Sequence, residues 1–223
     1  GWFQMRDVEV YPDVESLVEA TIEQAAELIR TEGLRKVAIS GGSAGVKIAA
    51  GLIKSLDSKN LLDQVTFYLA DERFVEADDP QSNFGQVKAL LEGQSPNFFL
   101  FDLPSASSIE ESVIEANKKL GDGFSFDLAL MGCGPDGHTA SLFPGHEYPN
   151  QTVIAELESP KPPSQRISFS YEVFLASSHV WFAASGEDKA TAVSQALSGN
   201  RSLPAGLIQG AVSTKWFITE ELA

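Results

Sequence analysis

The sequence predicts an α/β fold, a three-layer, Rossmann-like sandwich around a mostly parallel central sheet. Three observations support this prediction. Short runs such as KVAIS (36–40) and FDLALM (126–131) are apolar throughout, which is typical of strands buried on both faces. Helical patterns separate these runs along the chain. Glycine-rich or charged segments follow several of the runs, and ligands bind at that end of open parallel sheets.

The N-terminal half is predicted to alternate strands and helices. Its first helix has the clearest ends, because Asp13 is a typical N-cap and Gly33 a typical C-cap, with apolar residues at helical spacing from Val14 to Ile29. The strands expected in this half are 8–11, 36–40 and 65–70, and further helices are expected with an apolar face over 46–56 and over 83–91.

The C-terminal half adds further strands and helices. Ser108 and Glu111 form a capping-box pattern ahead of a helix that reaches about Leu120. The expected strands are 98–101, 126–131, 153–157, 166–170, 179–184 and 215–218, and another helix is expected over 187–197. The proline-rich segment 159–164 is short and precedes more strand-like runs, so we interpret it as a loop inside one domain spanning 1–223.

Composition restricts the classes of partner. The chain of 223 residues has 16 basic and 31 acidic side chains, a net charge of −15. This charge repels phosphate backbones and anionic membranes, so neither nucleic acid nor membrane is an expected partner. A local cluster of cations and backbone N–H groups can still bind a small anion. We expect the protein in the cytoplasm, because Cys133 is the single cysteine and the start of the chain lacks a long apolar signal region. A monomer or weak homodimer is expected.

Two segments at strand ends are candidate anion sites. Gly41, Gly42 and Ser43 lie between a strand and a helix, where backbone N–H groups and the helix N-terminus favour negative charge. A tight turn without a ligand is the alternative. Asp71-Glu72-Arg73 closes an apolar strand. A solvated loop is the ordinary explanation of such a triplet, and an arginine clamp for phosphate is the functional one.

The segment 132–145, GCGPDGHTASLFPG, is the most informative. Its glycines indicate a close approach of a ligand or unusual backbone angles. His138, two residues after Asp136, is a candidate general base in this loop. Cys133 is expected to be a packed, inert thiol.

The remaining histidines and two cations complete the candidates. His146 is expected at the rim of the loop and His179 in a structural role. Three scattered histidines and one cysteine do not have metal-ligand spacing, so no metal site is expected. Arg166 opens a strand, and Lys189 lies in the first turn of a predicted helix, where an ordinary surface lysine is the alternative to an anion ligand.

Together these segments resemble the 6-phosphogluconolactonases, within the family of glucosamine-6-phosphate isomerases and 6-phosphogluconolactonases. The GPDGHTASLFPG run is the most specific match. The other matching segments, in the family's order, are Ser40–Ser43, Asp71–Arg73 with Ser82 and Asn83, Pro160–Pro163 leading to Arg166, and Gly186 with Lys189. One departure is visible: Ala44-Gly45 stands where the family usually has Thr-Pro, which removes a hydroxyl group beside the predicted phosphate site.

The resemblance implies hydrolysis of 6-phospho-D-glucono-1,5-lactone to 6-phosphogluconate, in the oxidative pentose phosphate pathway, without an organic cofactor or catalytic metal. In that reaction His138 is expected to deprotonate a water and Asp136 to orient or stabilise the imidazole. The groups expected to hold the phosphate are Gly41, Gly42, Ser43, Arg73, Arg166 and Lys189. The other residues expected in the substrate site are Asp71, Glu72, Asn83, Gly134 and Gly137.

Two other functions are alternatives for such a fold. Glucosamine-6-phosphate deaminase resembles the same scaffold, but its loop has a glutamate that assists ring opening where this chain has Phe143. A phenyl ring transfers no proton. A non-catalytic sugar-phosphate sensor would carry a basic DNA-binding segment, for which the sequence has no room before residue 36 and the wrong net charge, −15.

Overall fold

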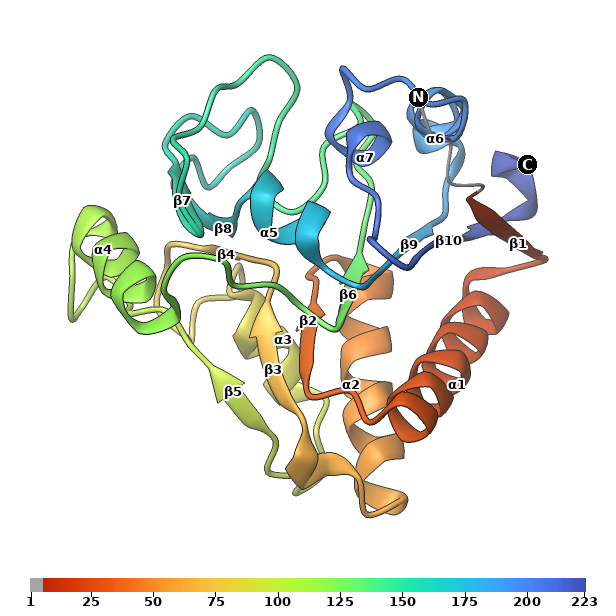
Figure 1. The fold of residues 1–223 in the computed structure, drawn as a ribbon, viewed down its shortest axis with the longest axis horizontal. Coiled ribbons are helices and arrows are strands. Elements are labelled where there is room, and N and C mark those ends of the chain that lie inside the picture. The colour runs from red at the N-terminus through yellow and green to blue at the C-terminus, as the bar shows by residue number, and fades with distance from the viewer. Residues whose placement is uncertain (1–5) are drawn as a thin grey trace.

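A computed structural model describes residues 6–223, and residues 1–5 of the expected domain lie outside this part. Its centre is a seven-stranded sheet in the order β1-β10-β9-β6-β2-β3-β5, in which every neighbouring pair is parallel (Figure 1). The predicted α/β fold with a mostly parallel central sheet is therefore confirmed. The strands of this sheet are β1 (Asp7–Tyr11), β2 (Lys36–Ile39), β3 (Thr66–Leu69), β5 (Asn97–Phe99), β6 (Leu128–Met131), β9 (His179–Ala184) and β10 (Ser213–Thr219).

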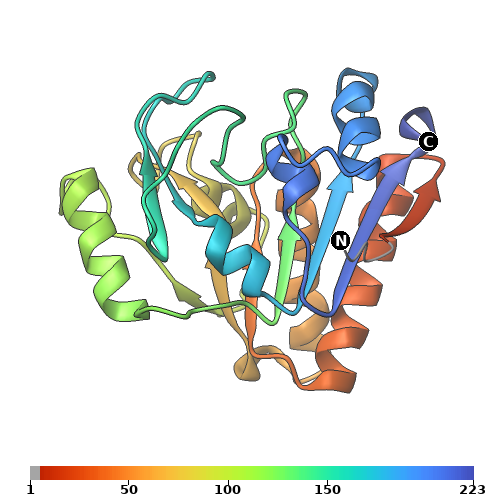
Figure 2. The same cartoon turned by 45° about the horizontal axis from the view of Figure 1, so that its top comes forward.

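Helices cover both faces of this sheet. Figure 2 shows α1 (Val14–Glu32) and α2 (Ser43–Ser58) behind the strands, and α5 (Tyr171–Ala176) and α7 (Pro204–Leu207) in front of them. The remaining helices are α3 (Asn83–Ala89), α4 (Ile109–Leu120) and α6 (Ala190–Leu197), and the 3₁₀ turns are Leu62–Gln64, Glu187–Lys189 and Glu220–Leu222. None of these helices within 6–223 is long and apolar enough to cross a membrane.

The local signals act as the sequence predicts. Asp13 accepts a hydrogen bond from Ser16 N (2.8 Å), and Gly33 ends α1 in the left-handed conformation at φ 64°. Ser108 Oγ likewise accepts from Glu111 N (3.1 Å) at the start of α4. Burial of β6 on both faces explains its continuous apolar sequence, since all four of its residues are buried.

A second, smaller sheet was not predicted. It has three antiparallel strands in the order β4-β8-β7, formed by Asp71–Arg73, Arg166–Phe169 and Val153–Glu156. The solvated-loop interpretation of Asp71-Glu72-Arg73 is wrong, because the segment is a strand with two of its three residues buried. The proline-rich segment 159–164 connects β7 to β8 within this sheet.

Three smaller differences concern helices. The helix predicted over 187–197 begins as a 3₁₀ turn, Glu187–Lys189, and becomes α-helical only at Ala190. Helices α5 and α7 were not predicted, because at six and four residues they are too short to show a helical period. Gly206 in α7 has no room for a side chain, since a Cβ there would lie 2.0 Å from Asn200 O.

Candidate active site

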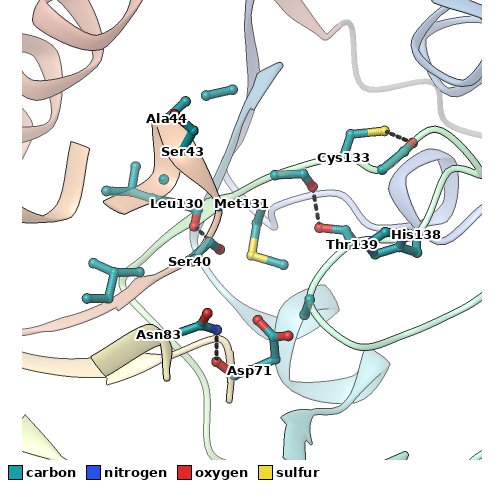
Figure 3. A pocket seen from close by; sticks show the side chains of 18 of the residues that line it. Ser40, Ser43, Ala44, Asp71, Asn83, Leu130, Met131, Cys133, His138 and Thr139 are labelled. Carbon is teal, nitrogen blue, oxygen red and sulfur yellow. Dashed lines mark hydrogen bonds between the residues drawn. The ribbon is translucent and has the colours of Figure 1, made fainter. Parts of the chain in front are cut away.

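A cavity of about 330 Å³ opens where the parallel strands end, between the large sheet and the small one. Figure 3 shows side chains at this cavity from the turn after β2, the starts of α2 and α3, β4, β6 and the loop after β6. The predicted site residues that line it are Gly41, Gly42, Ser43, Asp71, Arg73, Asn83, Gly134, His138, Arg166 and Lys189. Asp136, Glu72 and Gly137 do not line it.

The glycine-rich turn after β2 lies against the cavity wall. A Cβ on Gly41 would lie 2.2 Å from Asn83 Oδ1, so this close approach requires glycine. Gly42, at φ 82°, is the N-cap of α2 and supplies no side-chain hydrogen bond to the helix. The first N–H groups of α2 therefore face the site without a side-chain cap, which suits an anion. Gly45 is equally constrained, because its Cβ would meet Ser40 O at 2.7 Å.

Two arginines come together across the small sheet. Arg73 of β4 and Arg166 of β8 are direct register partners, so their side chains lie on the same face. Arg166 is buried and donates from Nε to Pro163 O (3.1 Å) and from Nη2 to Lys161 O (3.0 Å). Burial lowers the pKa of the Arg166 guanidinium. The negative charge of Asp71 acts in the opposite direction, and the positive charge of Arg73 lowers the pKa further.

Other cations join them at the cavity. Lys189, at the end of the 3₁₀ turn after β9, is the third predicted cation that lines it. Lys161, which was not among the predicted phosphate ligands, lines it as well. A chain of net charge −15 thus gathers four basic side chains around one cavity. Such a local cluster attracts an anion in spite of the overall field.

His138, which lines the cavity, forms a pair with Asp136 in the loop after β6. Asp136 Oδ1 lies 2.5 Å from His138 Nδ1 and accepts from His138 N (3.0 Å). Burial raises the pKa of the Asp136 carboxyl, but these hydrogen bonds from His138 outweigh burial and bring the pKa below its usual value. The carboxylate is therefore an acceptor, and we assign the Nδ1 proton to His138, which leaves Nε2 as the basic nitrogen.

Two glycines shape the turn that carries His138. A Cβ on Gly134 would lie 2.1 Å from His138 Cε1, so the imidazole rests directly on the backbone of Gly134. Gly137 has φ 88° and packs against Leu203, and its carbonyl accepts from Ala205 N (3.0 Å). Gly137 thus sets the turn and contacts α7, away from the cavity.

Asp71 and Asn83 also line the cavity and contact each other. Asp71 is buried, and its Oδ2 accepts from Ser141 Oγ (2.6 Å). Asn83 Nδ2 donates to Asp71 O (3.1 Å), as Figure 3 shows. Ser141 has no exposed surface and was missed by sequence reasoning, although it lies in the GPDGHTASLFPG run.

Glu72 points away from the cavity and holds the start of α3. Its carboxylate accepts from the backbone N–H groups of Arg73 (2.8 Å), Asn83 (2.8 Å) and Phe84 (2.9 Å). Burial raises the pKa of Glu72 to about 6, against the opposite effect of these N–H groups. Glu72 therefore fixes the backbone from which Arg73 and Asn83 reach the site.

This buried carboxyl gives a pH-dependent contribution to stability. Its pKa in the folded protein, about 6, exceeds the ordinary value of 4.5, so the folded state binds the proton more tightly than the unfolded state. The resulting stabilisation is fully present at pH values below the pKa of the unfolded state and is lost as the pH rises through 6. Between pH 5 and 7 wild type should lose about 1 kcal/mol of unfolding free energy relative to Glu72→Gln. Urea titrations of both proteins at each pH measure this, and parallel pH dependences would contradict it.

Two other candidate residues, Cys133 and His179, have structural surroundings. Cys133 lines the cavity, but burial raises the pKa of its thiol to about 12, so it is no nucleophile at neutral pH. His179 is buried, with Nε2 2.9 Å from Glu32 Oε2 and Nδ1 2.6 Å from Ser213 Oγ. Within 6–223 no group of three or more His, Cys, Asp or Glu side chains is arranged to hold a metal ion.

Comparisons with known proteins define the class. The family of glucosamine-6-phosphate isomerases/6-phosphogluconolactonase matches residues 13–216, so the chain belongs to this family. Among its relatives, 6-phosphogluconolactonase 3 of Saccharomyces cerevisiae is 33% identical, over 92% of this chain and 90% of that protein. The 6-phosphogluconolactonase of Streptomyces coelicolor is 32% identical, over 96% of this chain and 92% of that protein.

Solved structures give the same result for the fold. A 6-phosphogluconolactonase of Trypanosoma brucei superposes with a TM-score of 0.84 at 24% identity, covering 100% of this chain and 98% of that one. One from Thermotoga maritima has a TM-score of 0.81 at 26% identity, over 96% and 100% of the two chains. A monomeric glucosamine-6-phosphate deaminase also superposes, with a TM-score of 0.79 at 20% identity over 97% and 98%. The fold is thus shared by both reactions, and the site residues must distinguish them.

Proposed function

We propose that the protein hydrolyses 6-phospho-D-glucono-1,5-lactone to 6-phosphogluconate, as in the oxidative pentose phosphate pathway. One observation carries the proposal: His138, which is paired with Asp136, lines the same cavity as a cluster of cations. The substrate has the matching pattern, with an electrophilic carbonyl at one end and a phosphate dianion at the other. The names of the related proteins agree with this assignment.

The phosphate is assigned to the cationic side of the cavity. Arg73 and Arg166 offer paired N–H donors, and Lys189 offers a compact charge. The N-terminus of α2, with Gly41, Gly42 and Ser43, offers backbone N–H groups and a hydroxyl. Fixing the phosphate leaves the lactone ring near His138, which is the positioning that an already reactive ester needs.

His138 then acts as general base. Its Nε2 takes a proton from a water while the water oxygen forms a bond to C1, and the carbonyl electrons move to oxygen. Asp136 accepts from Nδ1–H and stabilises the imidazolium that results. Backbone N–H groups of the glycine-rich loop stabilise the oxyanion. When the intermediate collapses, the C1–ring oxygen bond breaks, and the ring oxygen takes the proton back from Nε2.

An acid-release assay tests the proposed activity. Freshly made 6-phosphogluconolactone is followed in weak buffer with and without the protein, since the lactone also hydrolyses spontaneously. The expected result is proton release well above the spontaneous rate and a product that 6-phosphogluconate dehydrogenase accepts. Release at the spontaneous rate would contradict the proposal. Ammonia released from glucosamine 6-phosphate would favour the deaminase reaction instead.

Activity is expected to survive exhaustive chelation. The proposed steps use only side chains and backbone groups, and residues 6–223 hold no cluster of three potential metal ligands. The measurement is the initial rate after dialysis against EDTA and again after adding zinc, magnesium or manganese. Loss of activity that a divalent ion restores would show that a metal takes part.

A further inference from the structure

Phe143 connects the two halves of the site. Its ring is almost fully buried, with 2% of the residue exposed, and also borders the cavity. The ring centroid lies 4.7 Å from that of His138, with an angle of 34° between the planes. It also lies 5.8 Å from Arg166 Cζ. One aromatic ring thus supports the proposed base and one of the proposed phosphate ligands.

The loop that carries Phe143 has little regular structure of its own. No helix or strand occurs between the end of β6 at Met131 and the start of β7 at Val153. A loop of this length needs tertiary contacts to hold its side chains in one place. Thr139 Oγ1 anchors the first half to Gly132 O (2.6 Å), and the second half depends on other groups.

Tyr148 and Glu156 hold the second half. Phe143 N donates to Tyr148 Oη (3.0 Å), and Tyr148 Oη donates to Glu156 Oε1 (2.8 Å). The carbonyl of Ser141 is a second acceptor at 3.4 Å, but the hydroxyl has one proton and Glu156 is closer and charged. Glu156 belongs to β7, so this chain of hydrogen bonds ties Phe143 to the small sheet.

The protonation states of Tyr148 and Glu156 set the direction of these hydrogen bonds. Glu156 is buried, yet its hydrogen bonds from Glu158 N, Tyr148 and His146 outweigh burial, which on its own would raise its pKa, and keep the pKa low. Burial raises the pKa of Tyr148 well above its usual value. The phenol therefore keeps its proton and donates it to a carboxylate, so every hydrogen bond runs in one direction, from Phe143 N to Glu156. Glu156 is also the register partner of Arg166 across β7 and β8.

We propose that Tyr148 and Glu156 are positioning residues that fix Phe143 as a shared platform for the imidazole of His138 and the guanidinium of Arg166. This inference rests on the proposed lactonase function. Neither residue touches the reacting atoms. Their effect passes through one ring, so disturbing them should impair the base and the phosphate ligand together.

The test is Tyr148→Phe, which removes only the hydroxyl. For the phosphorylated lactone kcat should fall ~3- to 30-fold and KM should rise, since one charge-assisted hydrogen bond is lost. For unphosphorylated glucono-1,5-lactone only the fall in kcat should remain. Tyr171→Phe is the matched control, because its ring lies 6.3 Å from that of Tyr148 but its hydroxyl is outside this chain of hydrogen bonds. Equal kinetics for the two variants would overturn the proposal, as would a lower Tm with unchanged constants.

Two further measurements keep the test decisive. Glu156→Gln retains an acceptor for Tyr148 but loses the charge, so it should show the same changes to a smaller extent. The ¹H–¹⁵N signals of the His138 imidazole should shift in Tyr148→Phe and stay in place in Tyr171→Phe. This readout does not depend on turnover. Unmoved His138 signals therefore refute the platform even in a protein without lactonase activity, and absence of wild-type turnover refutes the proposed function alone.

Discussion

Replacing His138 with alanine is expected to lower kcat by ~10²–10⁴, the usual effect of losing a general base. KM should change little, because the proposed phosphate ligands lie on other elements: Arg73 on β4 and Arg166 on β8. The imidazole rests on Gly134 and is only partly exposed, so its removal leaves a space shaped for that ring. Steady-state kinetics on the phosphorylated lactone measure both constants.

Chemical rescue makes this experiment sharper. Added imidazole should restore part of the activity of His138→Ala, because a free base can enter the space that the side chain has left. The same addition should leave the activity of wild type unchanged. Asp136→Asn should give a smaller loss, since the ring stays but its carboxylate partner is gone. Near-normal turnover of His138→Ala would remove His138 from the mechanism.

Arg73→Ala is expected to reduce kcat/KM for the phosphorylated lactone by ~10–200-fold, the equivalent of one charge-assisted contact worth ~1.5–3 kcal/mol. Its guanidinium borders the cavity and donates from Nη1 to Gln81 Oε1 (2.9 Å), a contact that the fold can lose. The loss on unphosphorylated glucono-1,5-lactone should be far smaller, since that substrate has no phosphate to contact. The ratio of the two losses is the measured quantity.

Arg30→Ala provides the matched control for charge. Arg30 lies on α1, exposed and paired with Glu27, so its removal changes the net charge by the same amount far from the cavity. Both lactones should be hydrolysed as in wild type. If Arg73→Ala instead depresses both lactones equally, Arg73 supports the fold or the base, and the phosphate lies elsewhere.

The large sheet was predictable from the sequence because its signals are local. Strands such as β6 and β9 are apolar in nearly every residue, and the helices between them have caps and periodic faces. Strand β4 gave no such signal. Its three residues are all charged, and it becomes a strand only by pairing with β8, about a hundred residues later. That long-range pairing overrides local propensity.

Strand β4, which was not predicted, also explains why Glu72 does not line the cavity whereas Asp71 and Arg73 do. Side chains alternate along a strand, so Asp71 and Arg73 share one face and line the cavity while Glu72 points to the other. Interpreting the triplet as a loop hid this alternation. The run around His138 was more informative about the site, because Gly134 and Asp136 both contact the histidine directly. The contacts of Tyr148 and Glu156 had no local signature at all.

The pairing of Arg73 with Arg166 links the site to the stability of the whole fold. Two guanidinium groups held side by side repel each other, and a dianion that contacts both cancels that repulsion. An anion that binds only the folded chain also stabilises it in proportion to the logarithm of its concentration. Because we propose that the phosphate of the substrate binds this pair, we expect the free energy of unfolding of this protein to rise with the concentration of phosphorylated sugar.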